Sequence, residues 1–511
     1  MKRIYTLLLA GLSTLGFTQS QDLAKLANGK LKNFTAVYDQ KQSVYGYVGI
    51  YDYGKTADDK VKFEYVFLDK NLNPVANKEF TGERQVDGYT PYLDFRNKII
   101  LTPTMGTFGL AAVMHSSRIT YPRTKEIDIQ KNSITDKDYF EYDEGVFKLT
   151  DYSKTAKAER AEDRNEKKSK GYNYRSGVYE IKEGGFLVVE YKDYGSYSNG
   201  NNLIRFDENK KEVWRFSYNT NGDKKVKEYF SLLNKDENKI FGILQNVNNK
   251  VNTFQLLVLD MKTGKVLHQS KITGLNDTTL DNITRFQTYS YGTIDNSKSF
   301  DDKIVLVGRN LTDKSRYAGF ARLMVDKNTY KVDAKTITYE SLKSFIPKLS
   351  DDGGVEKGYF LDPRDIFILK NGSVGVLLEK YKPAGQYSSQ KTTDMVYIFT
   401  DQNFKPGVKI FDKEKTRFST TDYLFSQYIN DGNDVVFFFR DYVKDNETRK
   451  KQWNLFINSV VDNQFKQETI QISSKGDYFM LPYVAKDGYI LFQESNEKDK
   501  YNQVRLERLN F

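Results

Sequence analysis

A segment in the middle of the chain decides the fold: Lys239-Ile240-Phe241-Gly242-Ile243-Leu244. Its apolar residues are continuous rather than alternating, so both faces of the strand they form must be buried. A second strand, Leu256-Leu257-Val258-Leu259-Asp260, ends in aspartate and a tight turn, and a third, Lys265-Val266-Leu267-His268, follows at once. A single open sheet cannot bury a strand on both sides, whereas sheets stacked face to face can.

The same order of strands recurs along the chain. Apolar segments occupy residues 185–191, 239–244, 303–308, 373–378, 434–439 and 488–492, and strands ending in aspartate occupy 63–69, 203–207, 256–260, 323–326 and 396–401. A further strand precedes each unit, and helical periodicity is nearly absent. Four strands per module at a spacing of roughly 50–70 residues are typical of β-propeller blades. The sequence therefore predicts an all-β propeller.

Eight modules can be counted, and a ring of seven blades is the alternative. They begin near Phe34, Tyr89, Gly177, Glu228, Phe286, Asp365, Asp422 and Asp477. The second is the least regular, with middle strands expected around Ile99–Leu101 and Leu110–Met114. The last has only three strands, which residues 22–32 could complete. We expect one propeller domain over residues 19–511, with an inserted loop at 131–176.

The pattern resembles that of exported bacterial β-propeller repeat proteins. Their blades run from Asp-Gly-Gly and an apolar strand to Leu-Asp-x-x-Gly-Lys and another apolar strand. The best matches here are residues 183–217 and 237–272, and the resemblance covers most of the chain after residue 33. It implies a fold and little chemistry, since such blades carry many functions. Tandem β-sandwiches fit the number of strands but not the regular order of turns.

The N-terminus predicts export. Met1-Lys2-Arg3 precedes a mostly apolar stretch, Ile4–Phe17, and small residues permit cleavage after Thr18. This is the pattern of a secretory signal peptide, and it is shorter than the roughly 20 apolar residues that span a bilayer. The chain has no cysteine, which excludes a lipoprotein anchor and disulfides. We expect a periplasmic or secreted protein without an integral membrane segment after cleavage.

The charge pattern argues against two classes of site. The formal net charge is +10, but Lys and Arg alternate with Asp and Glu almost everywhere. Such mixing is typical of a solvated surface, so we expect no nucleic-acid partner. Two histidines and no cysteine argue against a zinc site, and we expect no cofactor. The charged segment 153–164, inside the insertion, predicts a solvated helix or a mobile surface segment.

Loop lengths predict which face binds. Connections between first and second strands, and between third and fourth, are short. The long ones join second to third strands (192–201, 381–392 and 442–451) or successive modules (131–176, 273–285 and 340–363). Both long classes emerge at the same end of a four-stranded meander. Because function concentrates on loops held by a rigid scaffold, this loop-rich face is the predicted binding surface.

Few residues suggest chemistry. The candidate ligand-binding residues are the loop tyrosines Tyr191, Tyr194, Tyr197, Tyr381 and Tyr387, whose rings offer an apolar face and a polar tip. Asp351 and Asp352 form the best group of oxygen ligands for a metal, although a solvated turn is the simpler interpretation. The recurring strand-end aspartates are interpreted as structural turn residues; they are Asp69, Asp207, Asp260, Asp326 and Asp401.

The leading hypothesis is an exported, non-catalytic protein that binds a polysaccharide or a protein on its loop-rich face. The alternative is a secreted, glycosidase-like hydrolase with carboxylates at the propeller channel, where two carboxyl groups about 5–10 Å apart would be needed. The sequence identifies no catalytic residue and does not predict the oligomeric state.

Overall fold

The computed structural model describes most of the chain between residues 19 and 509. Within that range it leaves out residues 40–42, 59, 107–120, 171–172, 183, 194–199, 221–224, 250, 287, 289–291, 293, 387, 445–450, 463, 473–478 and 497–500.

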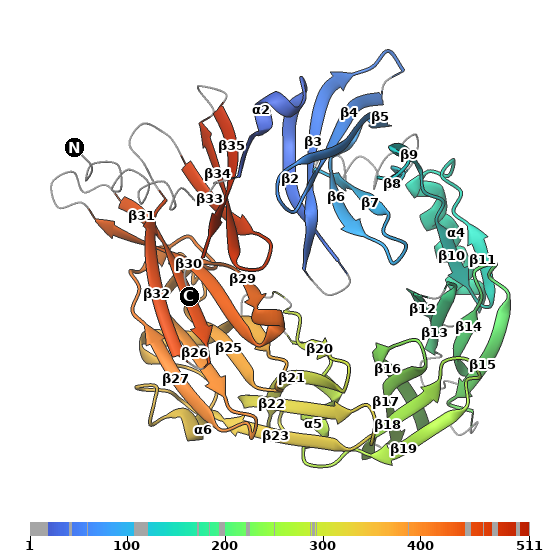
Figure 1. The fold of residues 1–511 in the computed structure, drawn as a ribbon. Helices are drawn as coiled ribbons and strands as arrows, with labels where there is room; N and C mark the ends of the chain where they lie inside the picture. Colours follow the sequence, from blue (N-terminus) through green and yellow to red (C-terminus); the bar gives the residue numbers. More distant parts are fainter. Residues whose placement is uncertain are drawn as a thin grey trace, which may run out of the picture.

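The described residues form nine antiparallel sheets, and eight of these contain a run of four neighbouring strands. Figure 1 shows the sheets arranged around a central opening, with β12, β16 and β20 bordering the opening and β15, β19 and β23 on the outside. This arrangement confirms the predicted all-β propeller, and the number of four-strand runs is compatible with the predicted seven or eight blades. We number these eight sheets in chain order.

The first four sheets are consecutive meanders. Sheet 1 contains β2 (Lys30–Tyr38), β3 (Val44–Lys55), β4 (Lys60–Asp69) and β5 (Pro74–Glu83); sheet 2 contains β6 (Val86–Leu93), β7 (Ile99–Met105), β8 (Lys125–Asp128) and β9 (Ser133–Asp136); sheet 3 contains β12 (Asn173–Glu180), β13 (Phe186–Asp193), β14 (Asn201–Phe206) and β15 (Glu212–Tyr218); sheet 4 contains β16 (Val226–Lys235), β17 (Lys239–Asn248), β18 (Val251–Asp260) and β19 (Val266–Lys271).

The remaining sheets follow the same plan. Sheet 5 contains β20 (Ser297–Ser299), β21 (Lys303–Leu311), β22 (Tyr317–Asp326) and β23 (Val332–Thr338); sheet 6 contains β24 (Phe360–Ile368), β25 (Val374–Lys382), β26 (Lys391–Thr400) and β27 (Pro406–Phe411), with the short β28 (Thr416–Arg417) also paired to β26; sheet 7 contains β29 (Tyr423–Ile429), β30 (Asp434–Lys444), β31 (Lys451–Val461) and β32 (Gln464–Gln471); sheet 8 contains β33 (Phe479–Val484), β34 (Tyr489–Asn496), β35 (Tyr501–Arg508) and β1 (Ser20–Asp22).

Strand β1 closes the fold. It pairs with β35 in the register Ser20↔Arg505, and the carbonyl of Gln19 accepts a hydrogen bond of 2.9 Å from the Leu506 amide. The prediction that the N-terminal region completes the last module is therefore confirmed. The strand covers 20–22 rather than 22–32, because α2 (Leu23–Leu26) and the start of β2 occupy the rest of that range.

The second strand of a sheet is buried on both faces, as its continuous apolar run predicts. In β30, every residue from Val435 to Phe439 is buried. Aromatic rings join neighbouring sheets here: Phe367 of sheet 6 stacks on Phe437 of sheet 7 with centroids 5.8 Å apart. The core is thus a series of apolar layers between sheets, which the hydrophobic effect favours in proportion to the area buried.

The strand-end aspartates act as turn residues, as the sequence predicts. Asp260 Oδ1 accepts hydrogen bonds from the amides of Lys262 (3.0 Å) and Thr263 (2.7 Å). The same bonds to nearby amides recur at Asp69, Asp207, Asp326 and Asp401. His268 lies on the outer strand β19 with its Nε2 2.8 Å from Ser270 Oγ.

One strand assignment needs correction, and another falls outside the described residues. The first strand of sheet 5 is Ser297–Ser299 rather than a segment near Phe286, which is buried and stacks on Phe320 at 6.4 Å. Helix α5 (Asp277–Asn282) takes up part of the preceding connection. In sheet 2 the strand expected at Leu110–Met114 lies outside the described residues, and β8 and β9 supply the outer half of the sheet.

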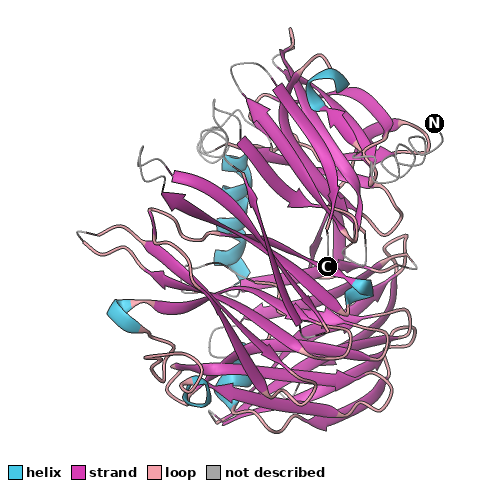
Figure 2. Cartoon of the chain, turned by 60° about the vertical axis from the view of Figure 1, so that its left-hand side comes forward, coloured by secondary structure: helices cyan, strands magenta, loops and turns pink. Residues whose placement is uncertain are grey.

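The insertion is partly ordered structure. Residues 133–136 belong to β9 of sheet 2, and the hairpin of β10 (Phe140–Asp143) and β11 (Val146–Leu149) follows. The charged segment forms helix α4 (Ala156–Lys170), consistent with one of the two predictions for it. Figure 2 shows that strands predominate in the molecule and that its helices are few.

The antiparallel order places the long connections at one end of the sheets. Successive strands reverse direction, so the connections from second to third strands and from one sheet to the next leave at the same end. These include residues 383–390, 412–422 and the segment 339–359, which holds α6 (Tyr339–Leu342). We call this end the loop-rich face.

Candidate functional site

Five buried charged residues lie at the loop-rich ends of sheets 6 and 7. Their side chains have little or no contact with solvent. We call them the ionic cluster; they are Asp362 and Arg364 of β24, Glu379 of β25, and Lys413 and Asp422 of the connection 412–422. Burying this many charges requires each to be paired and hydrogen-bonded, because an isolated buried charge is very costly.

Arg364 forms one half of the cluster. Its Nε lies 2.8 Å from Glu379 Oε2, and its Nη1 lies 3.0 Å from Asp362 Oδ2. The third nitrogen, Nη2, donates a hydrogen bond of 2.6 Å to the carbonyl of Thr420. The guanidinium therefore connects two strands of sheet 6 to the connection 412–422.

Lys413 and Asp422 form the other half. Lys413 Nζ lies 2.5 Å from Asp422 Oδ2 and 3.6 Å from Glu379 Oε1. The backbone amide of Asp422 donates to Glu379 Oε1 at 3.1 Å, and Thr392 Oγ1 donates to Asp422 Oδ2 at 3.0 Å. The two ends of the connection are thus held against each other and against sheet 6.

Burial and the nearby charges together shift the pKa values of Glu379 and Asp422 in opposite directions. Burial raises the pKa of Glu379, although Arg364 and Lys413 oppose the change. At Asp422 burial also acts to raise the pKa, but the nearby ammonium and hydroxyl donors outweigh it and hold the pKa below the ordinary value. Buried ion pairs seldom stabilise a fold relative to apolar residues. The role that the geometry supports is to fix the position of the connection.

The connection presents Phe418 to solvent. This side chain is 82 % exposed, the highest value among the large hydrophobic residues that the structure describes. Its backbone has a φ of 62°, in the left-handed region that a bulky residue rarely adopts. The conformation is held by a hydrogen bond of 3.0 Å from the Phe418 amide to the Gln390 carbonyl, next to the pairing of β28 with β26. Local strain of this kind collects at functional sites.

Cations and aromatic rings surround the same end of sheet 7. Arg440 Nε lies 3.3 Å from Asp422 Oδ1, and the Arg440 guanidinium lies 5.0 Å from the ring centre of Trp453. Lys451 Nζ lies 4.0 Å from the ring centre of Tyr442. Beside them Val443 is 58 % exposed.

The predicted tyrosines do not form one site. Tyr381, on β25, is buried beside the ionic cluster, with the Arg364 guanidinium 5.6 Å from its ring centre. Tyr191, on β13 of sheet 3, is partly exposed and lies against Tyr229 with centroids 5.8 Å apart. Tyr194, Tyr197 and Tyr387 lie outside the described residues. Their role in binding stays a prediction.

The predicted oxygen ligands have partners within their own loop. Asp351 is exposed and lies 2.7 Å from Lys343 Nζ. Asp352 accepts hydrogen bonds from Ser350 Oγ at 2.5 Å and from the Gly354 amide at 3.3 Å. Within the described part of the chain, no three His, Asp or Glu side chains are grouped so as to hold a metal ion.

A second polar group lies on the first strands, which border the central opening. Asp365 of β24 accepts hydrogen bonds at Oδ2 from Tyr423 Oη and, at 2.6 Å, from Ser426 Oγ, both on β29. Burial raises the pKa of Asp365. Nearby, Lys298 Nζ of β20 lies 3.1 Å from the ring centre of Tyr428, and burial lowers the pKa of Lys298 to about 8.

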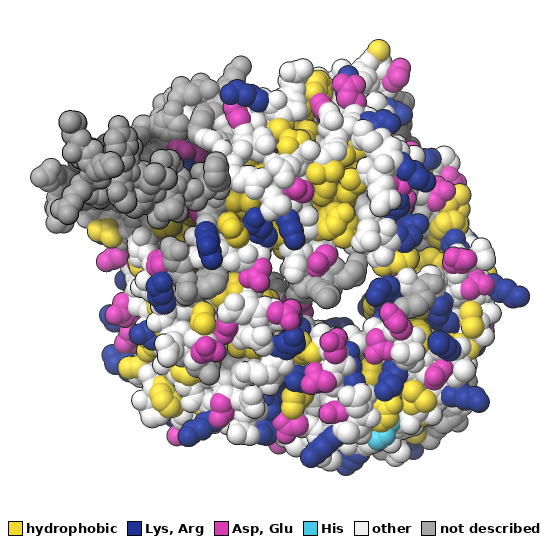
Figure 3. Space-filling model, viewed as in Figure 1, with side chains coloured by type: hydrophobic (Ala, Val, Ile, Leu, Met, Phe, Trp, Pro, Cys, Tyr) yellow, Lys and Arg dark blue, Asp and Glu magenta, His cyan; other side chains and the backbone are white. Residues whose placement is uncertain are grey.

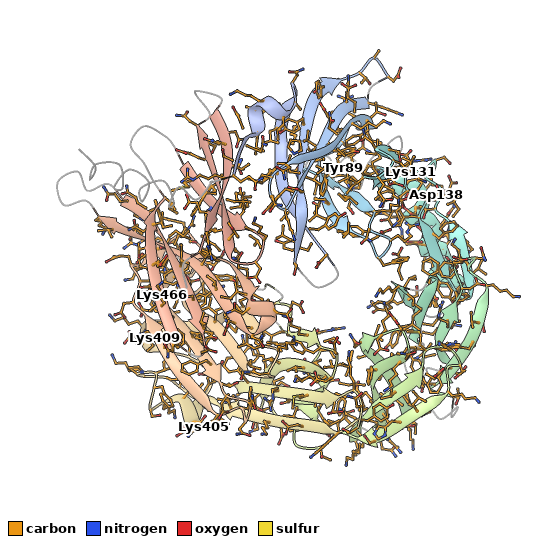
Figure 4. The ribbon with its side chains drawn as sticks, viewed as in Figure 1. Tyr89, Lys131, Asp138, Lys405, Lys409 and Lys466 are labelled. Carbon is orange, nitrogen blue, oxygen red and sulfur yellow. The ribbon has the colours of Figure 1, made fainter. Side chains whose placement is uncertain are left out.

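A third feature lies on the periphery. A groove of about 360 Å³ between the outer strands β27 and β32 has an aromatic floor of Phe411, Phe456 and Phe465. Lys409 and Lys466 stand on its two sides, and Figure 4 places both on the outside of the ring, away from the central opening. The groove therefore lies on the outer side of sheets 6 and 7, and it meets the connection that carries Phe418 only at its first residue, Asp412.

Sequence reasoning missed the ionic cluster and Phe418. The cluster draws on two strands and one connection, and each member looks like one charge among many in a chain of mixed charges. The available signal was the spacing of Asp362 and Arg364 around a proline in an otherwise apolar first strand. For Phe418, the signal was a phenylalanine between charged and hydroxyl residues in a predicted loop.

Comparison with known proteins supplies no functional assignment. No protein-family model matches the chain, and no curated protein matches it. Among solved structures, the chain is similar to the β-propeller domain of the Trilobed protease from Pyrococcus furiosus, with 11 % identity, a TM-score of 0.32 and coverage of 88 % of this chain and 97 % of that one. It is also similar to the WD40 domain of SCAP from fission yeast, with 8 % identity, a TM-score of 0.24 and coverage of 83 % and 92 %.

A third similar structure is prolyl oligopeptidase B from Galerina marginata, with 7 % identity, a TM-score of 0.31 and coverage of 85 % of this chain and 47 % of that one. Likenesses this distant do not bear on activity, and the assignment of the fold rests on the sheets themselves. Of the helices in the described residues, none is both long and apolar enough to cross a membrane.

Proposed function

We propose that this protein is a non-catalytic binding protein that engages a protein partner on its loop-rich face, with Phe418 at the centre of the contact. The observation that carries the proposal is the exposure of Phe418 on a connection held by buried ion pairs. Exposed single apolar residues are common, but a phenylalanine that is held out in a strained backbone conformation is not. Aromatic anchors of this kind dominate the binding energy of protein interfaces.

The surroundings favour a protein over a polysaccharide. Cations lie against the rings of Trp453 and Tyr442, so neither of these two rings offers both faces to a sugar. Among the described residues at this end of sheet 7, a strongly exposed apolar side chain is the aliphatic Val443. Exposed aromatic and aliphatic side chains on the loop-rich face suit apolar pockets on another protein.

The ionic cluster supports the same proposal energetically. Ordering a loop on binding costs about 0.5–1.5 kcal/mol for each side chain that becomes fixed. Arg364 and Lys413 hold the connection 412–422 in place before any partner arrives, so this cost is reduced.

Export is part of the proposal. Cleavage after Thr18 would leave Gln19 at the N-terminus, and Gln19 is the residue whose carbonyl bonds to β35. The mature chain would keep every described residue that closes sheet 8. The sequence pattern of the first 18 residues supports the assignment to the periplasm or the exterior.

One observation favours the alternative hydrolase. Asp365 is a carboxyl group with a raised pKa on a strand that borders the central opening, as a general acid requires. If this activity exists, Asp365→Asn would abolish hydrolysis of glycoside substrates while leaving partner binding unchanged. Equal activity of the variant and the wild type would remove Asp365 from consideration.

The binding proposal can be tested by site-specific photo-crosslinking. A benzophenone amino acid placed at position 418 is expected to give a discrete protein adduct in the envelope fraction of the producing cells. The matched control is position 213, where Val213 is an exposed residue on the outer strand β15. No adduct at 418, or the same adducts at both positions, would contradict the proposal.

A further inference from the structure

We infer that the protein partner presents an acidic surface, recognised by a row of three cations that borders Phe418. This inference rests on the proposed function and names the chemistry of the partner. The row consists of Lys382, Lys391 and Arg417, which we call the cation row.

The register of sheet 6 creates the cation row. Lys382 of β25 pairs with Lys391 of β26, and Lys391 pairs in turn with Arg417 of β28. Residues directly opposite each other in antiparallel strands project from the same face of the sheet. Three positive side chains therefore stand side by side across three strands, and Phe418 is the next residue after the last of them.

An arrangement of like charges in cross-strand pairs is unfavourable for the isolated fold. Among the described residues, no carboxylate lies within ion-pair distance of any of the three. Lys382 Nζ instead donates a hydrogen bond of 2.6 Å to the Lys357 carbonyl. A surface that keeps such a row without neutralising it is suited to a partner that supplies the negative charge.

Three acidic side chains close in sequence to the row or its contacts have other neighbours. Asp394, three residues after Lys391, pairs with Lys380 at 2.8 Å. Glu356, beside Lys357, pairs with Lys348 at 3.0 Å. Asp412, on the connection itself, lines the peripheral groove. None of these three carboxylates therefore forms an ion pair with the row.

A carboxylate-rich protein surface fits this arrangement better than a uniformly anionic polymer. Phe418 and the cation row together require one partner that offers an apolar pocket next to acidic groups. Charge complementarity of this kind raises association rates and suppresses wrong partners. Interactions between exposed charges also weaken as salt is added, because the screening length falls to about 8 Å at physiological ionic strength.

The test uses labelled peptides and the full mature chain. Fluorescence anisotropy would follow the binding of a poly-glutamate peptide that contains leucines, with a poly-lysine peptide of the same length as the reverse-charge probe. We expect the glutamate peptide to bind more tightly than the lysine peptide. The double variant Lys391→Glu/Arg417→Glu should weaken glutamate-peptide binding by about tenfold or more, a change of about 1.4 kcal/mol.

The matched control is Lys409→Glu/Lys466→Glu, which changes the net charge equally at the peripheral groove. It should leave the affinity within about twofold, well below the tenfold step that corresponds to 1.4 kcal/mol. An equal loss in both double variants would reduce the effect to net charge and overturn the inference. Equal binding of the two peptides would also overturn the inference. Tighter binding of heparin than of the glutamate peptide, lost in Lys391→Glu/Arg417→Glu, would overturn it as well and would assign the row to a polysaccharide.

Two readouts separate this inference from the proposed function. Because Lys391→Gln relieves like-charge repulsion, its thermal midpoint should equal or exceed that of the wild type, so a loss of binding in this variant cannot arise from unfolding. If position 418 forms an adduct but the charge variants bind normally, the acidic-partner inference fails and the proposed function stands. If the charge variants lose peptide binding but position 418 forms no adduct, the proposed function fails instead.

Discussion

Lys413 Nζ lies 2.5 Å from Asp422 Oδ2, and neither side chain has any surface exposed to solvent. The two residues stand at opposite ends of one connection, which leaves sheet 6 at Asp412 and enters sheet 7 at Tyr423. Between them the chain turns outward and exposes Phe418. Figure 3 shows a surface on which positive and negative side chains are mixed around the central opening, so this concealed pair differs from the general surface pattern.

Replacing Lys413 by methionine tests the pair. Asp422 and Glu379 would lose a buried cation, and removing one partner of a buried ion pair typically costs about 3–5 kcal/mol. We expect a loss of that size in the free energy of unfolding, measured by urea denaturation. The control is Lys415→Met on the exposed part of the same connection, which should change stability by less than about 0.5 kcal/mol. Equal stability of the two variants would show that the pair does not anchor the connection.

The pH dependence of stability separates Asp422 from Glu379. Asp422 has a lowered pKa in the folded state, so its contribution is present above the ordinary Asp value of 3.8 and is lost as the pH falls through the folded pKa. Asp422→Asn should therefore flatten the loss of stability in acid. Urea denaturation at a series of pH values would measure the free energy of unfolding. If Asp422→Asn loses as much stability in acid as the wild type, this assignment is contradicted.

For Glu379 the sign is opposite. Its folded pKa is raised, so its contribution is fully present below the ordinary Glu value of 4.5 and is lost as the pH rises through the folded pKa. Glu379→Gln should remove this loss of stability at rising pH and leave the separate loss of stability in acid unchanged. If the variant instead flattens the loss of stability in acid, as expected for Asp422→Asn, Glu379 is ionised in the fold and burial does not dominate.

Strand β1 makes a testable contribution to closure. In the register of β1 and β35, the pair Gln19–Leu506 is hydrogen-bonded, so the alternation of antiparallel pairs gives the same role to Gln21 and Val504. Gln21→Pro would remove a backbone donor and should cost about 1 kcal/mol. Ser20→Pro, where the amide faces away from β35, should cost less. Thermal unfolding would compare them, and equal midpoints would show that β1 does not close the fold.

Export predicts a defined mature N-terminus. N-terminal sequencing of protein from the envelope or culture medium should begin near Gln19, because cleavage is expected after Thr18. Recovery of the chain with Met1 in the cytosolic fraction would contradict export. The result bears on where the partner is to be sought but not on the ionic cluster.

The sheets could be predicted from sequence because their signals are local. Continuous apolar runs such as Val435–Phe439 must be buried on both faces, and aspartates such as Asp260 bond amides within three residues. The prediction that a strand begins near Phe286 was wrong for a physical reason. An aromatic residue followed by polar ones resembles a strand, but here Phe286 is a core residue in a long connection. The first strand begins eleven positions later, at Ser297.

The site could not be predicted because its contacts are not local. Arg364 meets Thr420 across 56 positions of sequence, and Asp422 meets Glu379 across 43. Nothing in either segment alone distinguishes a charge that will be buried from one that will be solvated. The cation row depends on register, since Lys391 faces Arg417 only because β28 adds to the edge of β26.

The most direct test of the account is competition at position 418. The adduct formed by the chain that carries the benzophenone amino acid at position 418 would be quantified in the presence of an excess of one unlabelled competitor. The competitors are the wild type, Phe418→Ala and Val213→Ala. The account predicts that the wild type and Val213→Ala suppress the adduct equally and that Phe418→Ala suppresses it at least about tenfold less effectively, as expected when an aromatic anchor is removed. Equal suppression by all three competitors would contradict the claim that Phe418 is the centre of a binding surface.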